Sequence, residues 1–273
     1  MAATMPSMPF EERTLGRTGL RVGRLGVAAS YGVPTAAVER AFERGVNYLY
    51  WGSLRRGAFA QALRNLASKR DRFVLVVQSY SRFPSLLQRS VELALRHLRM
   101  DHADILLLGL WNKPVSSRIL DASRDLRERG LARFLAVSTH QRPLVPQLAA
   151  HSDIDVIHFR YNAAHPGAEA DIFPHLPTAA RPGMVSFTAT SWGQLLKPSR
   201  IPPGERVPTA SDCYRFVLAR PEVDVCLTGP ANAAQLDEAL RALERGPMDD
   251  AELAWMRRVG AAVSGKRPGK RPV

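Results

Sequence analysis

Hydrophobic and polar positions along this chain follow two patterns that alternate. Short apolar runs rich in β-branched residues are typical of buried strands, and longer segments with apolar residues every three or four positions are typical of helices. In residues 84–98, for example, Leu87, Val91 and Leu95 fall on one helical face. The predicted strands cover residues 46–51, 73–77, 104–108, 134–137, 154–159, 184–188 and 223–227. The predicted helices cover residues 34–44, 58–68, 84–98, 119–129, 143–150, 210–219, 233–243 and 249–261.

This alternation predicts an α/β fold with a parallel sheet and right-handed crossovers. About eight strand–helix units in 273 residues fit a single closed (β/α)8 TIM barrel, which needs about 250 residues. An open doubly wound sheet is the alternative, and it is disfavoured because no G-x-G-x-x-G motif follows the first strand. We expect a barrel domain over residues 13–262, a flexible N-terminal arm over residues 1–12 and a basic flexible tail over residues 263–273.

Several stretches match the motifs of one known family. Residues 45–56, GVNYLYWGSLRR, closely resemble the second barrel strand of the aldo/keto reductases, G-[VI]-N-x-[FL]-D-T-A-x-x-Y-G. The sequence around Thr18 and Gly19 predicts a β-hairpin over Arg13–Val22, and it resembles the N-terminal hairpin of that family. Further matches follow in the family's order: residues 104–108, residues 130–138, Tyr161 with Asn162, and Gly229 with Asn232, Gln235 and Glu238. The resemblance covers nearly the whole chain and implies an aldo/keto reductase-like barrel with an N-terminal hairpin.

The catalytic residues of the family are changed in this chain. The resemblance implies four catalytic positions, which in the family hold Asp, Tyr, Lys and His. Here they hold Tyr50, Arg55, Ser79 (or Gln78, by a shift of one residue) and Gly109. Loss of the Asp and the Lys together leaves no unpaired buried charge, whereas loss of one partner alone would cost about 3–5 kcal/mol. We therefore do not expect the standard carbonyl reduction of the family.

Two residues are candidate catalytic groups in place of the missing ones. Tyr50 is a phenol at a strand end near the expected nicotinamide position, and His140 follows the strand at 134–137. Without a neighbouring Lys, the pKa of the Tyr50 phenol should lie near its ordinary value of about 10, or above it if the side chain is buried. Tyr50 is therefore expected to be a poor acid–base group at neutral pH.

The resemblance also implies a site for NAD or NADP. In the family, polar side chains hold the nicotinamide amide, an aromatic ring stacks on the nicotinamide, and hydroxyl groups bind the pyrophosphate. The residues at the corresponding positions are Ser138, Thr139, His158, Phe187, Thr188, Thr190, Ser191, Gly229, Asn232, Gln235 and Glu238. Residues 229–231 contain no Lys or Arg that would pair with a 2′-phosphate. We therefore expect no preference for NADP.

Aromatic and charged residues near the strand ends suggest a substrate pocket. Trp51 and Trp111 could line it, although aromatic residues at strand ends also serve as ordinary core. Arg160 could bind an anionic substrate, or it could pair with Glu169.

A group of histidines offers a third kind of chemistry. Its members are His140, His158, His165 and His175. Zinc sites use such ligands, but no His-x-His or His-Glu-x-x-His spacing occurs, so we expect no metal.

The composition narrows the class of partner. The net charge of +13 comes almost entirely from arginines, which are spread along the predicted helices, and no nucleic-acid-binding motif accompanies them. We expect a small-molecule ligand and neither a nucleic acid nor a membrane as partner. Cys213 and Cys226 lack the spacing of a disulfide framework or zinc ribbon, and the N-terminus lacks the pattern of a signal peptide. A cytoplasmic protein is expected.

Three functions remain open at this point. The first is a divergent NAD(P)-linked oxidoreductase with substituted acid groups. The second is a non-catalytic pseudoenzyme that acts as a binding or regulatory barrel. The third is a metal-dependent lyase or hydrolase that uses the loop histidines.

Overall fold

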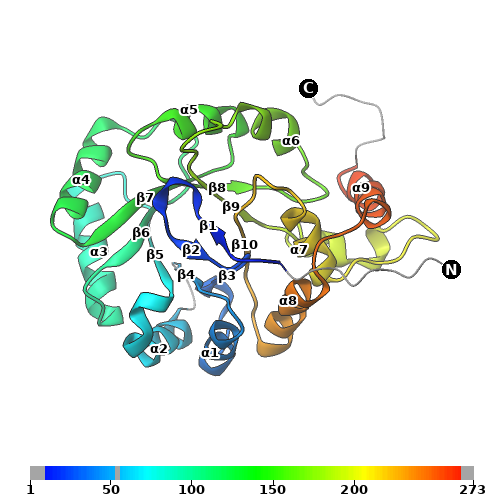
Figure 1. Ribbon diagram of the computed structural model, residues 1–273, viewed down its shortest axis with the longest axis horizontal. Coiled ribbons are helices and arrows are strands. Elements are labelled where there is room, and N and C mark those ends of the chain that lie inside the picture. The colour runs from blue at the N-terminus through cyan, green and yellow to red at the C-terminus, as the bar shows by residue number, and fades with distance from the viewer. Residues whose placement is uncertain (1–9, 53–55, 266–273) are drawn as a thin grey trace.

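Within residues 10–52 and 56–265, which the computed structural model describes, eight parallel strands close into a barrel (Figure 1). In chain order they are β3 (Leu25–Ala28), β4 (Tyr48–Trp51), β5 (Val74–Ser79), β6 (Ala103–Leu108), β7 (Ala132–Thr139), β8 (Val156–Arg160), β9 (Gly183–Phe187) and β10 (Val225–Thr228). Each strand pairs with the next along the chain, and β10 pairs with β3. This closure confirms the predicted barrel and excludes the open sheet.

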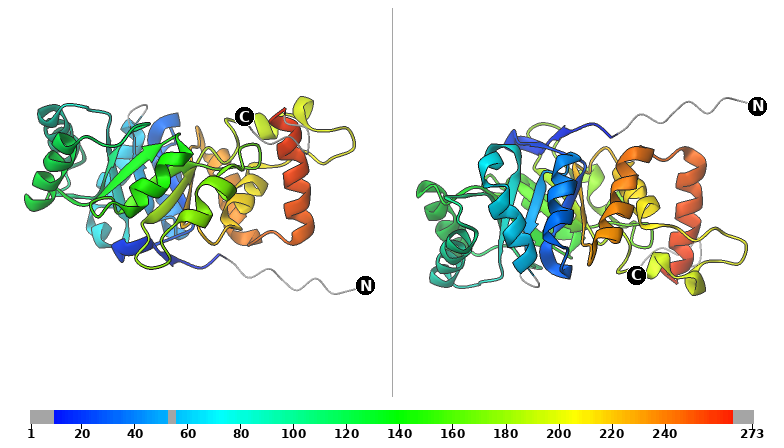
Figure 2. Two further views of the ribbon diagram at one scale, coloured as in Figure 1. Left: turned by 90° about the horizontal axis from the view of Figure 1, so that it is seen from above. Right: turned by 90° about the horizontal axis from the view of Figure 1, so that it is seen from below.

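Helices surround the barrel as an outer layer (Figures 1 and 2). They are α1 (Thr35–Glu43), α2 (Gly57–Asn65), α3 (Pro84–Leu98), α4 (Ser117–Glu128), α5 (Val145–Ala150), α6 (Ala168–Asp171), α7 (Ala210–Leu218), α8 (Ala233–Arg245) and α9 (Asp250–Val263). The apolar face predicted for α3 is buried against the barrel. Short 3-10 turns occupy several connections: Gly16–Thr18, Ala29–Tyr31, Ala67–Arg72, Arg142–Leu144, Phe173–His175, Gln194–Leu196 and Pro198–Arg200.

An antiparallel hairpin of β1 (Arg13–Thr14) and β2 (Arg21–Val22) closes the end of the barrel where the strands begin. It lies in front of the barrel in Figure 1. Leu15 and Val22 are fully buried in the cluster of side chains that fills the barrel interior. Gly16 has a φ of +46°, and a Cβ there would lie 2.2 Å from the backbone nitrogen of Gly183. The hairpin is thus held tightly against the barrel floor, as the resemblance implied.

Alternation along each strand separates two sets of side chains. Tyr48 belongs to the cluster inside the barrel, whereas Leu49 and Trp51 belong to the cluster between the strands and the helices. Successive side chains of a strand point to opposite faces, so Tyr50 shares the inward side with Tyr48. Whether a predicted site residue can face the cavity therefore depends on which face of its strand it occupies.

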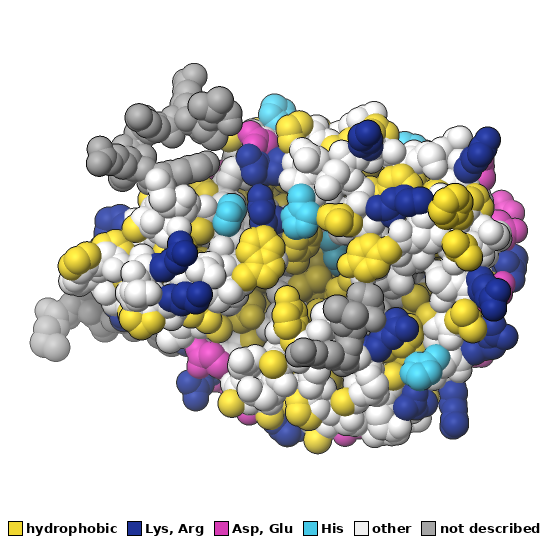
Figure 3. All heavy atoms as spheres, turned by 180° about the vertical axis from the view of Figure 1, so that it is seen from behind, with side chains coloured by type: hydrophobic (Ala, Val, Ile, Leu, Met, Phe, Trp, Pro, Cys, Tyr) yellow, Lys and Arg dark blue, Asp and Glu magenta, His cyan; other side chains and the backbone are white. Residues whose placement is uncertain are grey.

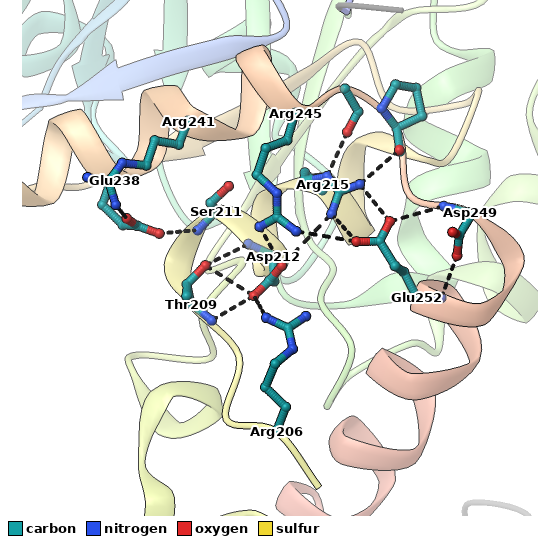
Figure 4. A network of polar contacts seen from close by, with 12 residues as sticks. Arg206, Thr209, Ser211, Asp212, Arg215, Glu238, Arg241, Arg245, Asp249 and Glu252 are labelled. Carbon is teal, nitrogen blue, oxygen red and sulfur yellow. Dashed lines mark hydrogen bonds and ion pairs between the residues drawn. The ribbon is translucent and has the colours of Figure 1, made fainter. Parts of the chain in front are cut away.

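A network of charged side chains joins α7 to α8 and α9 (Figure 4). The carboxylate of Asp212 is fully buried and accepts hydrogen bonds from Arg206 at 3.0 Å and from Arg245 at 2.8 Å. Thr209 caps α7 together with Asp212 in a reciprocal capping box. Arg215, which is nearly buried, forms two hydrogen bonds with Glu252 on α9. The network connects α7 to α9 and, through Arg206, to the long loop between β9 and α7.

Most predicted boundaries agree with the structure to within a few residues. The clearest difference is the predicted helix 58–68, because α2 ends at Asn65 and a 3-10 turn follows from Ala67. Residues 1–9 of the predicted arm and residues 266–273 of the predicted tail lie outside the described residues. In the part of the chain that the structure describes, no helix combines the length and the apolar character needed to cross a membrane.

Candidate functional site

The carboxyl ends of the strands open into a cavity of about 940 Å³. Figure 3 views the molecule from the side opposite to the hairpin, where the surface is hollowed and hydrophobic side chains gather around the hollow. In (β/α)8 barrels the reactive groups lie at this end. The predicted site residues that line the cavity are Tyr50, Ser138, His140, His158, Phe187, Thr188, Thr190, Gly229, Asn232, Gln235 and Glu238.

The remaining predicted site residues do not line this cavity. They are Trp51, Trp111, Thr139, Arg160 and Ser191. Trp51 faces the helices, where its ring stacks on His97 of α3. The ring of Trp111 is nearly buried and is covered by the guanidinium of Arg82 at 4.0 Å. The two tryptophans are therefore core residues around the barrel, which was the other interpretation of their positions.

Tyr50 and Gln78 form a neutral pair in the wall of the cavity. The Tyr50 hydroxyl donates a hydrogen bond of 2.5 Å to Gln78 Oε1. Of the two residues that the sequence left open, Gln78 is thus the one that faces the cavity. Ser79 is buried on the other face of β5, where its hydroxyl accepts a hydrogen bond of 2.8 Å from Ser90 on α3. An uncharged hydrogen-bonded pair therefore stands where the resemblance implies an Asp and a Lys.

The space beside Gly109 is already occupied. A Cβ at this position would lie 2.6 Å from Gln78 Nε2 and 2.6 Å from the ring of Tyr80. A real Cβ essentially never comes this close to a non-bonded heavy atom, so an imidazole can be added here only if these neighbours move. Arg55, at the fourth catalytic position of the resemblance, lies outside the described residues.

Burial makes the phenols and the inner histidine of the site poor proton carriers at neutral pH. It raises the pKa of Tyr50 well above its ordinary value, with a smaller contribution from Tyr80. Below Tyr50, the Tyr48 hydroxyl lies 2.8 Å from His158 Nε2. Burial lowers the pKa of His158 to about 3. His158 is therefore a neutral hydrogen-bonding group at pH 7.

Replacing His158 with glutamine is expected to make folding less sensitive to acid. The unfolded chain binds a proton at His158 near pH 6.5, whereas the folded protein does so only near pH 3. Folding stability therefore falls as the pH drops through this window, by an amount on the order of a few kcal/mol. Urea unfolding at pH 7 and pH 4.5 measures the difference, with the exposed His175→Gln as control. If the free energy of unfolding falls equally between pH 7 and pH 4.5 in the His158→Gln and wild-type proteins, the lowered pKa of His158 is contradicted.

His140 is the titratable side chain of the cavity with an unused buried nitrogen. Its Nδ1 is buried and has no hydrogen-bond partner among the described residues. Its ring packs edge-on against Phe187, with the centroids 5.3 Å apart. The pKa of His140 is lowered by burial and by the positive charge of Arg160. The imidazole, whose ring lines the cavity, is therefore neutral at pH 7.

Unfavourable backbone conformations are concentrated at the cavity rim. Thr188, Ser191 and Trp192 all have positive φ values, of 60°, 51° and 53°, although none is a glycine. Leu110, on the opposite wall, has a φ of 55°. Each such residue costs on the order of 1–3 kcal/mol, and they cluster at functional sites. The loop after β9, where the sequence predicts pyrophosphate contacts, is thus strained at the place where a ligand would bind.

The histidines of the third hypothesis lie in different surroundings. His165 contacts the side-chain oxygen of Asn162 at 3.1 Å, and His175 is exposed to solvent. Among the described residues, no three His, Cys, Asp or Glu side chains come together in a way that could hold a metal ion.

Several aromatic side chains of the site were missed in the sequence. Tyr31, Tyr80 and Tyr214 line the cavity, and the first two are about half exposed at its rim. Tyr80 lies just after β5, so its position after the predicted strand 73–77 was the available signal. Together with Trp192, Tyr31 and Tyr80 give the cavity an aromatic mouth.

Comparisons with known proteins agree with this architecture. No protein-family model matches the chain. It is 23% identical over 300 residues to L-galactose dehydrogenase of Arabidopsis thaliana, a match that covers 90% of this chain and 92% of that protein. The aldo-keto reductase AKR11C1 from Bacillus halodurans superposes with a TM-score of 0.73, at 18% identity in its holo form and 19% in its apo form. Both structural matches cover 92% of this chain and 96% of the other. The chain is thus similar over nearly its whole length to L-galactose dehydrogenase, and it shares the barrel fold of a solved aldo-keto reductase.

Proposed function

We propose that the protein is an NAD(P)-linked oxidoreductase in which His140, and not a tyrosine, accepts and donates the proton that accompanies hydride transfer. The observation that carries the proposal is the open cavity of about 940 Å³, whose walls contain most of the residues expected for a dinucleotide. A non-catalytic binding barrel would share this cavity, and the presence or absence of turnover with a bound dinucleotide separates the two hypotheses.

The cavity walls suit a dinucleotide that is held mainly by neutral groups. Phe187 offers a ring for the nicotinamide, and Ser138 is fixed because its hydroxyl accepts a hydrogen bond of 2.8 Å from the Leu110 nitrogen. Thr188 and Thr190 offer hydroxyl groups, and α8 begins at the cavity with Asn232 as its cap. A helix N-terminus favours phosphate groups. When bound, the dinucleotide would supply or accept the hydride.

His140 would move the proton that accompanies the hydride. In the oxidation of an alcohol, the neutral imidazole of His140 accepts the hydroxyl proton, and in the reverse direction it returns that proton to the carbonyl oxygen. A base that is neutral at pH 7 is suited to the first direction. The phenol of Tyr50 is less suited, because its pKa lies far above neutral pH and its hydroxyl already donates to Gln78.

We expect the reduced forms of both dinucleotides to bind with similar affinity, within about threefold. The reason is that none of the described residues lining the cavity is Lys or Arg, so no side chain there pairs with a 2′-phosphate. Fluorescence titration with NADH and NADPH measures both dissociation constants.

Two variants of that titration test the location of the site. Phe187→Ala should weaken both dinucleotides, whereas Leu93→Ala, an exposed change on α3 away from the cavity, should affect neither. A strong NADPH preference would show that an arginine outside the lining has taken over the 2′-phosphate. Absence of binding to either dinucleotide would overturn the proposed function.

A further inference from the structure

Arg160 carries a positive charge at the edge of the cavity, and none of the described acidic side chains forms an ion pair with it. It ends β8 on the same face of the strand as His158, two residues earlier. Its guanidinium carbon lies 6.0 Å from the ring centre of Trp192, which forms part of the cavity wall. Within residues 10–52 and 56–265, that ring is its only recorded partner, and no hydrogen bond or ion pair holds the guanidinium.

The two acidic side chains that follow Arg160 most closely in the sequence pair with other residues. Glu169, the partner that the sequence offered for Arg160, accepts a hydrogen bond of 2.6 Å from Tyr161 and pairs with Arg257 at 3.0 Å. Asp171 pairs with Arg142 at 2.6 Å. The ion pair between Arg160 and Glu169 that the sequence left open is therefore not formed.

The surroundings of Arg160 are positive rather than neutral. Its pKa is lowered by burial and by the nearby charge of Arg142, and no carboxylate offsets these effects. The charge of Arg160 in turn helps to lower the pKa of His140. A half-buried guanidinium with all its donors free is suited to a planar anion, because it can give two parallel hydrogen bonds to a carboxylate or a phosphate.

We propose that Arg160 binds an anionic group of the substrate, and that the substrate is a hydroxy or carbonyl compound carrying a carboxylate or a phosphate. With its anion at Arg160, such a molecule would extend along the Trp192 ring toward His140. The identity of the reacting group rests on the proposed function. The anion site does not, because it requires neither hydride transfer nor a dinucleotide.

The test is a titration of the full-length protein with oxalate and with inorganic phosphate, without dinucleotide. Tryptophan fluorescence and the NMR signal of the His140 ring, identified from its absence in His140→Gln, report binding beside Trp192 and His140. Arg160→Ala should weaken binding at least tenfold, and Arg160→Lys should restore part of it. Arg72→Ala is the matched control, because this exposed guanidinium also lies over a ring, Phe42 at 5.3 Å, but beside the hairpin end of the barrel.

The anion that binds more tightly in this titration distinguishes a carboxylate from a phosphate substrate. Equal binding by wild-type protein and Arg160→Ala would overturn the proposal, and so would the absence of a response at His140 to either anion. If Arg160→Ala does not fold, Arg160→Gln keeps most of the side chain without its charge and gives the same comparison. Anion binding without dinucleotide binding would refute the proposed function alone.

Discussion

His140→Gln is expected to reduce turnover by about 10²–10⁴-fold, the usual contribution of a positioned acid–base group. The dissociation constant of the dinucleotide should stay unchanged, because glutamine keeps a polar side chain of similar reach beside Phe187. The assay follows dinucleotide absorbance with the best substrate from a panel of aldoses and 2-hydroxy acids. Simple aldehydes and quinones should not be reduced appreciably, since Tyr50, Gln78 and Gly109 stand at three of the four catalytic positions that the resemblance implies.

The pH profile provides a second measurement of the same role. The pKa of His140 lies below its ordinary value of 6.5 because of burial and Arg160. Only the neutral imidazole accepts a proton, so kcat/KM for alcohol oxidation should fall as the pH drops through that pKa and should be level above it.

Tyr50→Phe is the matched comparison for His140. It removes the hydrogen bond to Gln78 and should change turnover by much less than His140→Gln. If Tyr50→Phe instead abolishes turnover with dinucleotide binding intact, Tyr50 is a relocated acid and the assignment to His140 is wrong.

Asp212→Asn is expected to lower the free energy of unfolding by about 3–5 kcal/mol, the cost of breaking a buried ion pair on one side. The carboxylate is fully buried and accepts hydrogen bonds from Thr209, Arg206 and Arg245. An amide cannot accept from all three, and the nearly buried guanidinium of Arg215 loses a counter-charge 3.9 Å away (Figure 4). Urea unfolding monitored by circular dichroism measures the loss.

An exposed ion pair provides the control for Asp212. Asp237 lies 3.6 Å from Arg40, and both side chains are about half exposed, so Asp237→Asn should cost less than about 1 kcal/mol. A loss at position 212 no larger than this would show that the network contributes little to folding.

The same network predicts a loss of stability in acid. Burial alone would raise the pKa of Asp212, but the hydrogen bond from the Thr209 nitrogen and the charges of Arg245 and Arg206 lower it below its ordinary value. The unfolded chain therefore takes up the proton first, and the stabilisation from Asp212 is lost as the pH falls below about 4 toward the folded-state pKa.

The fold was predictable from the sequence because its signals are repetitive and local. Segment 84–98 shows a clear helical period, and the strands are short apolar runs separated by turn residues. Motifs such as residues 130–138 then occurred in the order of one family. Each prediction depended on neighbours within about fifteen residues, a range over which periodicity is informative.

The details of the site depend on the facing of strand residues and on contacts between residues distant in the chain, which the sequence does not show. A shift of one residue turns a strand side chain to the other face, which is why Ser79 and Gln78 could not be separated and why Trp51 was placed at the pocket. The partner of Glu169 was equally open, since Arg257 lies 88 residues away in the chain. Most of the predicted lining was nevertheless found around the cavity, because residues that follow parallel strands necessarily meet at one end of a barrel.

The packing around Gly109 also limits how the site could be engineered toward the catalytic residues that the resemblance implies. A histidine introduced there places atoms where Tyr80 and Gln78 already lie, and an aspartate introduced at position 50 alone is a charge with no lysine to meet it. Each of these single substitutions is therefore unfavourable, whereas simultaneous replacement at positions 50, 78, 80 and 109 removes both obstacles. Screens of single mutants for aldehyde reduction should accordingly find none among these positions.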